Sequence, residues 1–94
     1  MMSEDRIGIG LIGCGGMCRH TTRKLLAQSE RFVVRGLCDP DERSIKATLE
    51  LTPGAKVYED YRELVKAPDI DWVMIASWNC FHKEQTIAAF EAGK

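Results

Sequence analysis

Three glycines near the N-terminus have the spacing of a turn that binds phosphate groups. Gly13, Gly15 and Gly16 follow the apolar run 7–12 and precede a helix-compatible stretch that begins at about Met17. Glycine at the first position lets the chain turn tightly, and the absence of a Cβ at Gly15 lets a pyrophosphate approach the backbone N–H groups where the helix starts. The pattern therefore predicts a dinucleotide-binding corner. Its candidate contacts are Gly13, Cys14, Gly15, Gly16 and Met17.

The glycine pattern is incomplete at its last position. Cys18 stands where G-x-G-x-x-G expects a third glycine, whose role is to let the helix lie close to the first strand. Cysteine is small and apolar, so the helix still fits with a slight displacement. An incomplete motif leaves a glycine turn without any ligand as the alternative, and an acidic residue downstream decides between the two.

Asp39 is that acidic residue. It ends the β-forming segment 32–39 and follows Gly13 by 26 positions, near the ~20 expected for a carboxylate that accepts hydrogen bonds from the adenosine ribose. A second interpretation is structural, because Pro40 and Glu42 would then stand at the first and third helical positions behind an Asp39 helix cap. Both roles are compatible, since the residue that ends this strand also precedes the next helix.

A polar and aromatic segment, Ser-Trp-Asn-Cys-Phe-His at 77–82, follows the apolar run 72–76 and is predicted to be a loop. In a parallel sheet of the dinucleotide-binding order, the first and fourth strands lie side by side and a ligand binds beyond their carboxyl ends. This loop and the glycine corner would then form the two sides of one crevice. Ser77 and Asn79 offer hydrogen bonds there, whereas Trp78 and Phe81 either line the cofactor or simply bury apolar area.

The remaining sequence supplies alternating strands and helices. Strands are expected at 7–12, 32–39, 56–58 and 72–76, and helices at 17–29, 41–51, about 60–66 and 83–92, the last ending at a C′ glycine, Gly93. This alternation predicts an α/β fold with a doubly wound parallel sheet, four strands in βαβαβαβα order. Residues 1–94 are expected to form one small domain.

Charge and cysteine content restrict the class of protein. The chain has 13 basic and 14 acidic residues in a mixed distribution, so it has no basic stripe for nucleic acid and no polybasic patch for a membrane. A polar N-terminus predicts neither signal peptide nor membrane span, and hence a cytoplasmic protein. Four cysteines without a C-x-x-C pair are expected to be reduced structural thiols. A metal site from Cys14, Cys38, Cys80 and His82 is the alternative, although their spacing matches no compact ligand motif.

Five segments together resemble a known family. These are Gly-Leu-Ile-Gly-Cys-Gly-Gly-Met, Cys-Asp-Pro-Asp, Tyr-Glu-Asp-Tyr-Arg-Glu-Leu, Asp-Ile-Asp-Trp-Val-Met-Ile-Ala and Glu-Gln-Thr-Ile-Ala-Ala-Phe-Glu-Ala-Gly-Lys. With their spacing, they are similar to the N-terminal half of the Gfo/Idh/MocA oxidoreductases, the relatives of glucose-fructose oxidoreductase and inositol dehydrogenase. The resemblance covers nearly the whole chain.

The resemblance implies an NAD(P)-binding Rossmann domain. Gly13 and Gly15 would contact the pyrophosphate and Asp39 the adenosine ribose. The carboxylate of Asp39 would favour NAD over NADP, because it repels a 2′-phosphate and no arginine follows it immediately. The residues implied beside the cofactor in the last loop are Ser77, Asn79 and His82. Trp78 stands where the family commonly has proline, so this loop departs from the family pattern.

In the family, the chain continues into a fifth strand, a Glu-Lys-Pro tripeptide with the catalytic lysine, and a substrate domain. The resemblance thus implies an inactive N-terminal fragment of an enzyme that moves a hydride between nicotinamide and a sugar- or polyol-like substrate. The unpaired edge of the fourth strand is then expected to promote self-association. A non-catalytic nucleotide-binding or sensor module is the alternative. A methyltransferase ranks below both, because no acidic residue precedes the first glycine.

Overall fold

The computed structural model describes residues 6–76 and 79–94, with the backbone alone for 79–81. Within these ranges, strands and helices alternate as the sequence predicts. The strands are β1 (Ile7–Ile12), β2 (Phe32–Cys38), β3 (Lys56–Val57) and β4 (Trp72–Ile75). The helices are α1 (Gly16–Gln28), α2 (Glu42–Leu51), α3 (Tyr61–Lys66) and α4 (Asn79–Glu91). The predicted βαβαβαβα order is confirmed.

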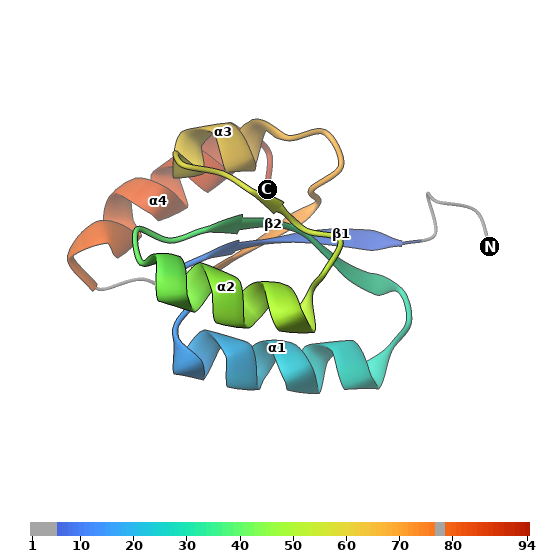
Figure 1. Cartoon of the computed structure of the whole chain (residues 1–94). Coiled ribbons are helices and arrows are strands. Elements are labelled where there is room, and N and C mark those ends of the chain that lie inside the picture. Colours follow the sequence, from blue (N-terminus) through green and yellow to red (C-terminus); the bar gives the residue numbers. More distant parts are fainter. Residues whose placement is uncertain (1–5, 77–78) are drawn as a thin grey trace.

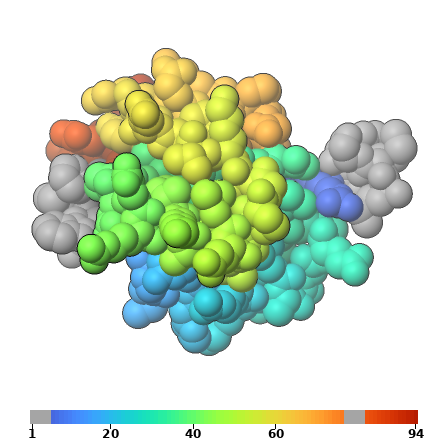
Figure 2. Space-filling view, in the orientation of Figure 1, coloured from blue at the N-terminus to red at the C-terminus, as the bar shows by residue number. Residues whose placement is uncertain are grey.

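The four strands form one parallel sheet in the order β3-β2-β1-β4. The predicted contact between the first and fourth strands is confirmed, with Gly10 opposite Val73 and Ile12 opposite Ile75. Helices α1 and α2 cover one face of the sheet, and α3 and α4 cover the other (Figure 1). In the space-filling view, α2 and the chain leading to β3 lie between α1 and α3 (Figure 2). The result is a three-layer α/β/α arrangement.

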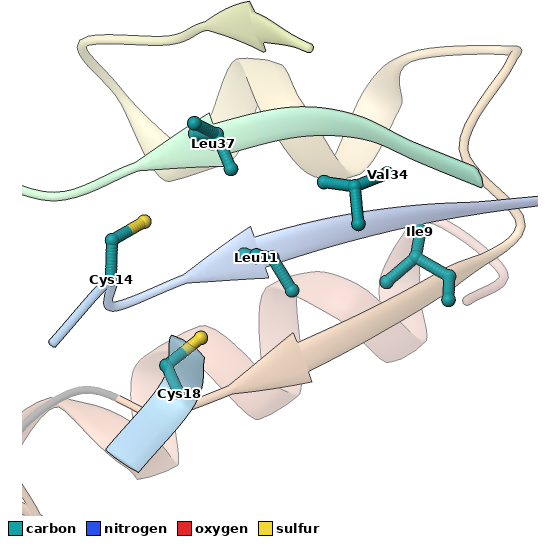
Figure 3. Packing of buried hydrophobic residues seen from close by; sticks show 6 residues of the cluster. All are labelled: Ile9, Leu11, Cys14, Cys18, Val34 and Leu37. Carbon is teal, nitrogen blue, oxygen red and sulfur yellow. The ribbon is translucent and has the colours of Figure 1, made fainter. Parts of the chain in front are cut away.

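Strand β1 is the centre of the core because both of its faces are covered. Ile9 and Leu11 are buried in a cluster with Val34 and Leu37 of β2 on the side of α1 and α2 (Figure 3). Ile12 belongs to a second cluster that contains residues of α3 and α4. Burial on both faces explains why the strand sequence is almost continuously apolar.

Glycines in β1 and β2 allow α3 and the chain that follows it to approach the sheet closely. A Cβ added at Gly10 would lie 2.6 Å from Cδ2 of Leu64, and one added at Gly36 would lie 2.8 Å from Cδ1 of Ile70. Leu64 and Ile70 are fully buried. These glycines are therefore required by packing rather than by backbone conformation.

Helix α4 begins one turn earlier than the sequence predicts. Its first residue is Asn79 rather than Lys83, so the last four residues of the predicted loop over 77–82 belong to the helix. No proline or glycine interrupts 79–82, and nothing in this stretch therefore stops the helix from extending toward its N-terminus.

At the C-terminal end of α4, Gly93 has φ 79°. Its N–H donates to the Phe90 carbonyl, and the N–H of Lys94 donates to the Ala89 carbonyl. These bonds form a Schellman motif and confirm the predicted C′ glycine.

Strand β4 pairs with β1 on one side only, and no other strand of the described chain covers its outer edge. Trp72 at its start is 52% exposed. Because an uncovered apolar edge is a template for pairing with another chain, we expect the protein to self-associate through β4. Light scattering coupled to size-exclusion chromatography should give a concentration-dependent mass that Trp72→Lys reduces. Val57→Lys, on the opposite edge strand, is the matched control and should leave the mass unchanged. A monomeric parent chain would contradict this prediction.

In the part of the chain that the structure describes, no helix is both long and apolar enough to cross a membrane.

Candidate functional site

The glycine corner lies where β1 ends and α1 begins. Gly13 has φ 92°, a conformation that favours glycine, and its N–H donates to the Cys38 carbonyl at 2.8 Å. Gly15 is the N-cap of α1, and no side chain accepts a hydrogen bond at this cap. The first N–H groups of a helix lack intrahelical partners, so they are available to an anion such as a phosphate group. A Cβ added at Gly15 would meet no atom within 4 Å, which leaves room for such a group.

Asp39 is connected to this corner directly. Its Oδ2 accepts a hydrogen bond from the N–H of Cys14 at 2.7 Å, and its Oδ1 accepts one from the N–H of Asp41 at 2.7 Å. The carboxylate is thus fixed beside the glycine corner, while its remaining lone pairs can still accept hydrogen bonds. The predicted position at the carboxyl end of the second strand is observed.

The alternative interpretation of Asp39, as the cap of the second helix, is wrong. The N-cap of α2 is Asp41, whose Oδ1 accepts from the Arg43 N–H at 2.9 Å. Asp39 lies two residues before that cap, and its carboxylate bonds across the sheet edge to the glycine corner instead. The local sequence does not distinguish Asp39 from Asp41, because both are acidic residues that directly precede a helix-forming segment.

Two further residues hold the glycine corner, and sequence reasoning did not assign them to the site. The carbonyl oxygen of Cys14 accepts from the guanidinium of Arg19 at 2.7 Å and from the hydroxyl of Thr48 at 3.2 Å. Helical periodicity places Arg19 on the outer side of α1, yet it is half-buried. Thr48 is fully buried on α2. The sequence signal that could have indicated the role of Thr48 is its position as a polar residue on the apolar face of α2.

The cysteines near the corner are neutral and structural. Burial, followed by the nearby Cys18 and Asp39, raises the pKa of the Cys14 thiol from 9.0 to about 12. Burial likewise raises the pKa of Cys18 and Cys38. Cys18, at the expected third-glycine position, packs into the core below the corner, with its Sγ 3.9 Å from Oγ1 of Thr22 (Figure 3). In the described ranges, no three His, Cys, Asp or Glu side chains are placed to hold a metal ion, and the side chain of Cys80 is outside them.

The raised pKa of Cys14 predicts a loss of stability in alkali. Below pH 9 the thiol is protonated in both states; between pH 9 and 12 only the unfolded chain loses the proton, so the free energy of unfolding falls. The slope should approach about 1.4 kcal/mol per pH unit for a single thiol. Urea unfolding at pH 8, 9 and 10 measures it. Cys14→Ala should reduce the slope and leave the part due to Cys18 and Cys38, whose pKa values are also raised, and an unchanged slope in this variant would contradict the assignment to Cys14.

The structure brings the first group of predicted contacts together. Gly13, Cys14, Gly15, Gly16 and Asp39 lie at one corner, and the Met17 side chain beside them is 77% exposed.

The structure describes only some of the predicted contacts of the last loop. Ser77 and Trp78 lie outside the described residues, Asn79 starts α4, and His82 is half-buried in its first turn. The N–H of Ala76 donates to the Ile12 carbonyl at 2.7 Å, so this segment starts beside the glycine corner.

A parallel sheet ordered β3-β2-β1-β4, a glycine turn leading into an uncapped helix and an acidic residue at the end of β2 define a dinucleotide-binding domain of the Rossmann type. The family model described as the oxidoreductase family with an NAD-binding Rossmann fold, GFO_IDH_MocA, matches residues 7–94. The chain belongs to this Gfo/Idh/MocA family, and the resemblance noted from the sequence is confirmed.

Curated relatives include inositol 2-dehydrogenases. The chain is 36% identical over 90 residues to that of Serratia proteamaculans, a match covering 94% of this chain and 26% of the relative. It is 34% identical over 87 residues to that of Pseudomonas savastanoi pv. phaseolicola, covering 92% of this chain and 26% of the relative. The chain therefore spans about a quarter of the length of the curated relatives it matches.

Solved structures agree with this relationship. The myo-inositol dehydrogenase from Lactobacillus casei, in complex with NAD(H) and myo-inositol, superposes with a TM-score of 0.86 at 29% identity, over 95% of this chain and 26% of that chain. The scyllo-inositol dehydrogenase from the same organism, with bound NAD(H) and scyllo-inositol, gives a TM-score of 0.81 at 26% identity, again over 95% of this chain and 26% of that one.

Proposed function

We propose that the chain holds NAD(H) beyond the carboxyl ends of β1, β2 and β4. The pyrophosphate lies against the Gly13–Met17 turn, and the adenosine ribose bonds to Asp39. The segment that follows β4 borders the cofactor through Ser77, Trp78, Asn79 and His82. The observation that carries this proposal is the hydrogen bond from the Cys14 N–H to Asp39, because it fixes the expected ribose acceptor beside the expected phosphate site.

In this proposal, residues 1–94 are the N-terminal part of the NAD-binding domain of an oxidoreductase. The bound cofactor supplies hydride transfer to or from its nicotinamide ring. The chain's own residues bind and orient the cofactor, and none is assigned a catalytic role. Because the relatives named above are inositol dehydrogenases, the proposed substrate of the whole protein is a sugar- or polyol-like alcohol. We also infer a cytoplasmic location, which the free thiols of Cys14, Cys18 and Cys38 support.

Titration of the chain with NADH, followed by cofactor fluorescence and by calorimetry, tests the binding proposal. We expect saturable binding of one NADH per chain, with competition by ADP-ribose, which keeps the ribose and the pyrophosphate. Absence of binding to a folded chain, established by circular dichroism in the same sample, would overturn the proposal.

The substrate proposal needs a separate assay on a protein that contains this domain. Reduction of NAD+ should be measured over a panel of inositols and other polyols. Turnover with at least one of them is expected, and NADH binding without turnover over the whole panel would overturn the substrate class alone.

A further inference from the structure

Cys14 connects the glycine corner to helix α2 through both its N–H group and its carbonyl group. The N–H of Cys14 donates to Oδ2 of Asp39, and Oδ1 of Asp39 accepts from the N–H of Asp41, the N-cap of α2. Two helical turns later, the hydroxyl of Thr48 donates to the carbonyl of Cys14 at 3.2 Å. The same helix therefore begins beside the ribose acceptor and returns to the phosphate turn.

The contact made by Thr48 is not the one that a helical threonine makes by default. A threonine hydroxyl inside a helix commonly donates to the carbonyl four residues before it. Thr52, at the end of α2, follows this rule and donates to the Thr48 carbonyl at 2.9 Å. Thr48, which is fully buried, donates instead to a residue 34 positions away in the chain. Its hydroxyl therefore stabilises the glycine corner and does not bond to a carbonyl of its own helix.

Fixing the Cys14 carbonyl also fixes the next N–H group. In a trans peptide, the carbonyl and the following N–H point in opposite directions, and the described chain contains no cis peptide. The Cys14 carbonyl points to the buried Thr48, so the Gly15 N–H points away from α2. Gly15 is the uncapped N-cap of α1, with open space around it. Thr48 thus determines the direction of one N–H group that the proposed pyrophosphate site offers.

We propose that Thr48 is a positioning residue for the cofactor: its hydroxyl, together with Arg19, holds the Cys14 carbonyl so that the Gly15 N–H is directed at the pyrophosphate. This inference rests on the proposed function and assigns a role in it to α2, a helix outside the glycine corner. Arg19 approaches the same carbonyl from α1 and also brings a positive charge to the corner. Both donors can be accommodated, because a carbonyl oxygen has two lone pairs.

The test compares three threonine variants of the full chain. Thr48→Val preserves the shape of the side chain and removes the donor, whereas Thr48→Ser keeps the donor. Thr52→Val removes a hydroxyl of the same kind, also buried, that bonds only within α2, and it is the matched control. We expect Thr48→Val to weaken binding of NADH and of ADP-ribose by about fivefold, the loss typical of one hydrogen bond. Thr48→Ser and Thr52→Val should bind within twofold of the parent.

Adenosine, which has the ribose but no pyrophosphate, separates positioning from general destabilisation. Its affinity should be equal in the parent and in Thr48→Val, whereas a merely loosened fold would weaken it together with NADH. In the amide NMR spectrum, the Gly15 resonance of Thr48→Val should also be displaced before any ligand is added. Should Thr48→Val fail to fold, Thr48→Cys, with only a weak S–H donor, takes its place.

Two results would overturn the inference. One is unchanged NADH affinity in Thr48→Val, and the other is an equal loss of affinity in Thr48→Val and Thr52→Val. Neither coincides with failure of the proposed function, which would appear as a parent chain that binds no NADH.

Discussion

Replacement of Gly15 by valine is expected to abolish NAD(H) binding and to leave the chain folded. A Cβ at this position meets no protein atom within 4 Å, and Gly15 has φ −73°, which any residue adopts without strain. The branched side chain would therefore occupy only the space proposed for the pyrophosphate. Loss of that contact should weaken binding by at least about 100-fold, since each 1.4 kcal/mol corresponds to a factor of ten.

Calorimetric titration with NADH measures this loss, and thermal unfolding checks the fold. Gly54→Val is the matched control, because its added Cβ also meets nothing within 4 Å and Gly54 lies in the turn between α2 and β3. The control should bind as the parent does. If Gly15→Val bound NADH with parental affinity, the glycine corner would be a turn without a ligand.

Replacement of Asp39 by alanine is expected to weaken NADH binding by about 10- to 100-fold and to remove a preference for NADH over NADPH. A hydrogen bond to a charged group contributes about 1.5–3 kcal/mol, and the carboxylate repels a 2′-phosphate. The variant also removes the acceptor of the Cys14 N–H, so the glycine corner loses one of the hydrogen bonds that hold it. Competitive titration of the parent and the variant with both cofactors measures the change.

Asp41→Ala is the control for the Asp39 experiment. Its carboxylate caps α2 and makes no contact with the glycine corner, so its loss should cost about 1 kcal/mol of stability and preserve the cofactor preference. Tighter binding of NADPH than NADH by the parent, or parental affinity in Asp39→Ala, would refute the ribose assignment.

Most of the fold follows from patterns that act over short distances. Apolar runs such as 72–76, separated by amphipathic stretches, predict a parallel sheet, and the strand order of dinucleotide-binding sheets places β4 beside β1, as observed. Gly93 was also correctly predicted as the residue that terminates the last helix, because its hydrogen bonds are made within a few residues.

The errors and omissions involve contacts and boundaries that short-range sequence patterns do not encode. Asp39 resembles a helix cap locally, yet it bonds to Cys14. Arg19 lies on the polar side of its helix, but its long side chain returns to the Cys14 carbonyl. Thr48 resembles an ordinary member of a buried helix face, and only the folded chain places it next to the corner. The start of α4 was missed because aromatic and polar residues permit both helix and loop.

The close approach of α3 to the sheet has a consequence for how this domain tolerates variation. In a pooled library of all single substitutions, changes at Gly8, Gly10 and Gly36 should deplete variants from an abundance screen, because each added Cβ would lie within 3 Å of a neighbouring atom. Changes at Gly15 should survive that screen and disappear only when the pool is selected on an immobilised cofactor. The glycines of this short domain would then fall into two groups: those that tolerate no added side chain because α3, the segment after it or a neighbouring strand lies too close, and Gly15, which tolerates none because of the proposed ligand.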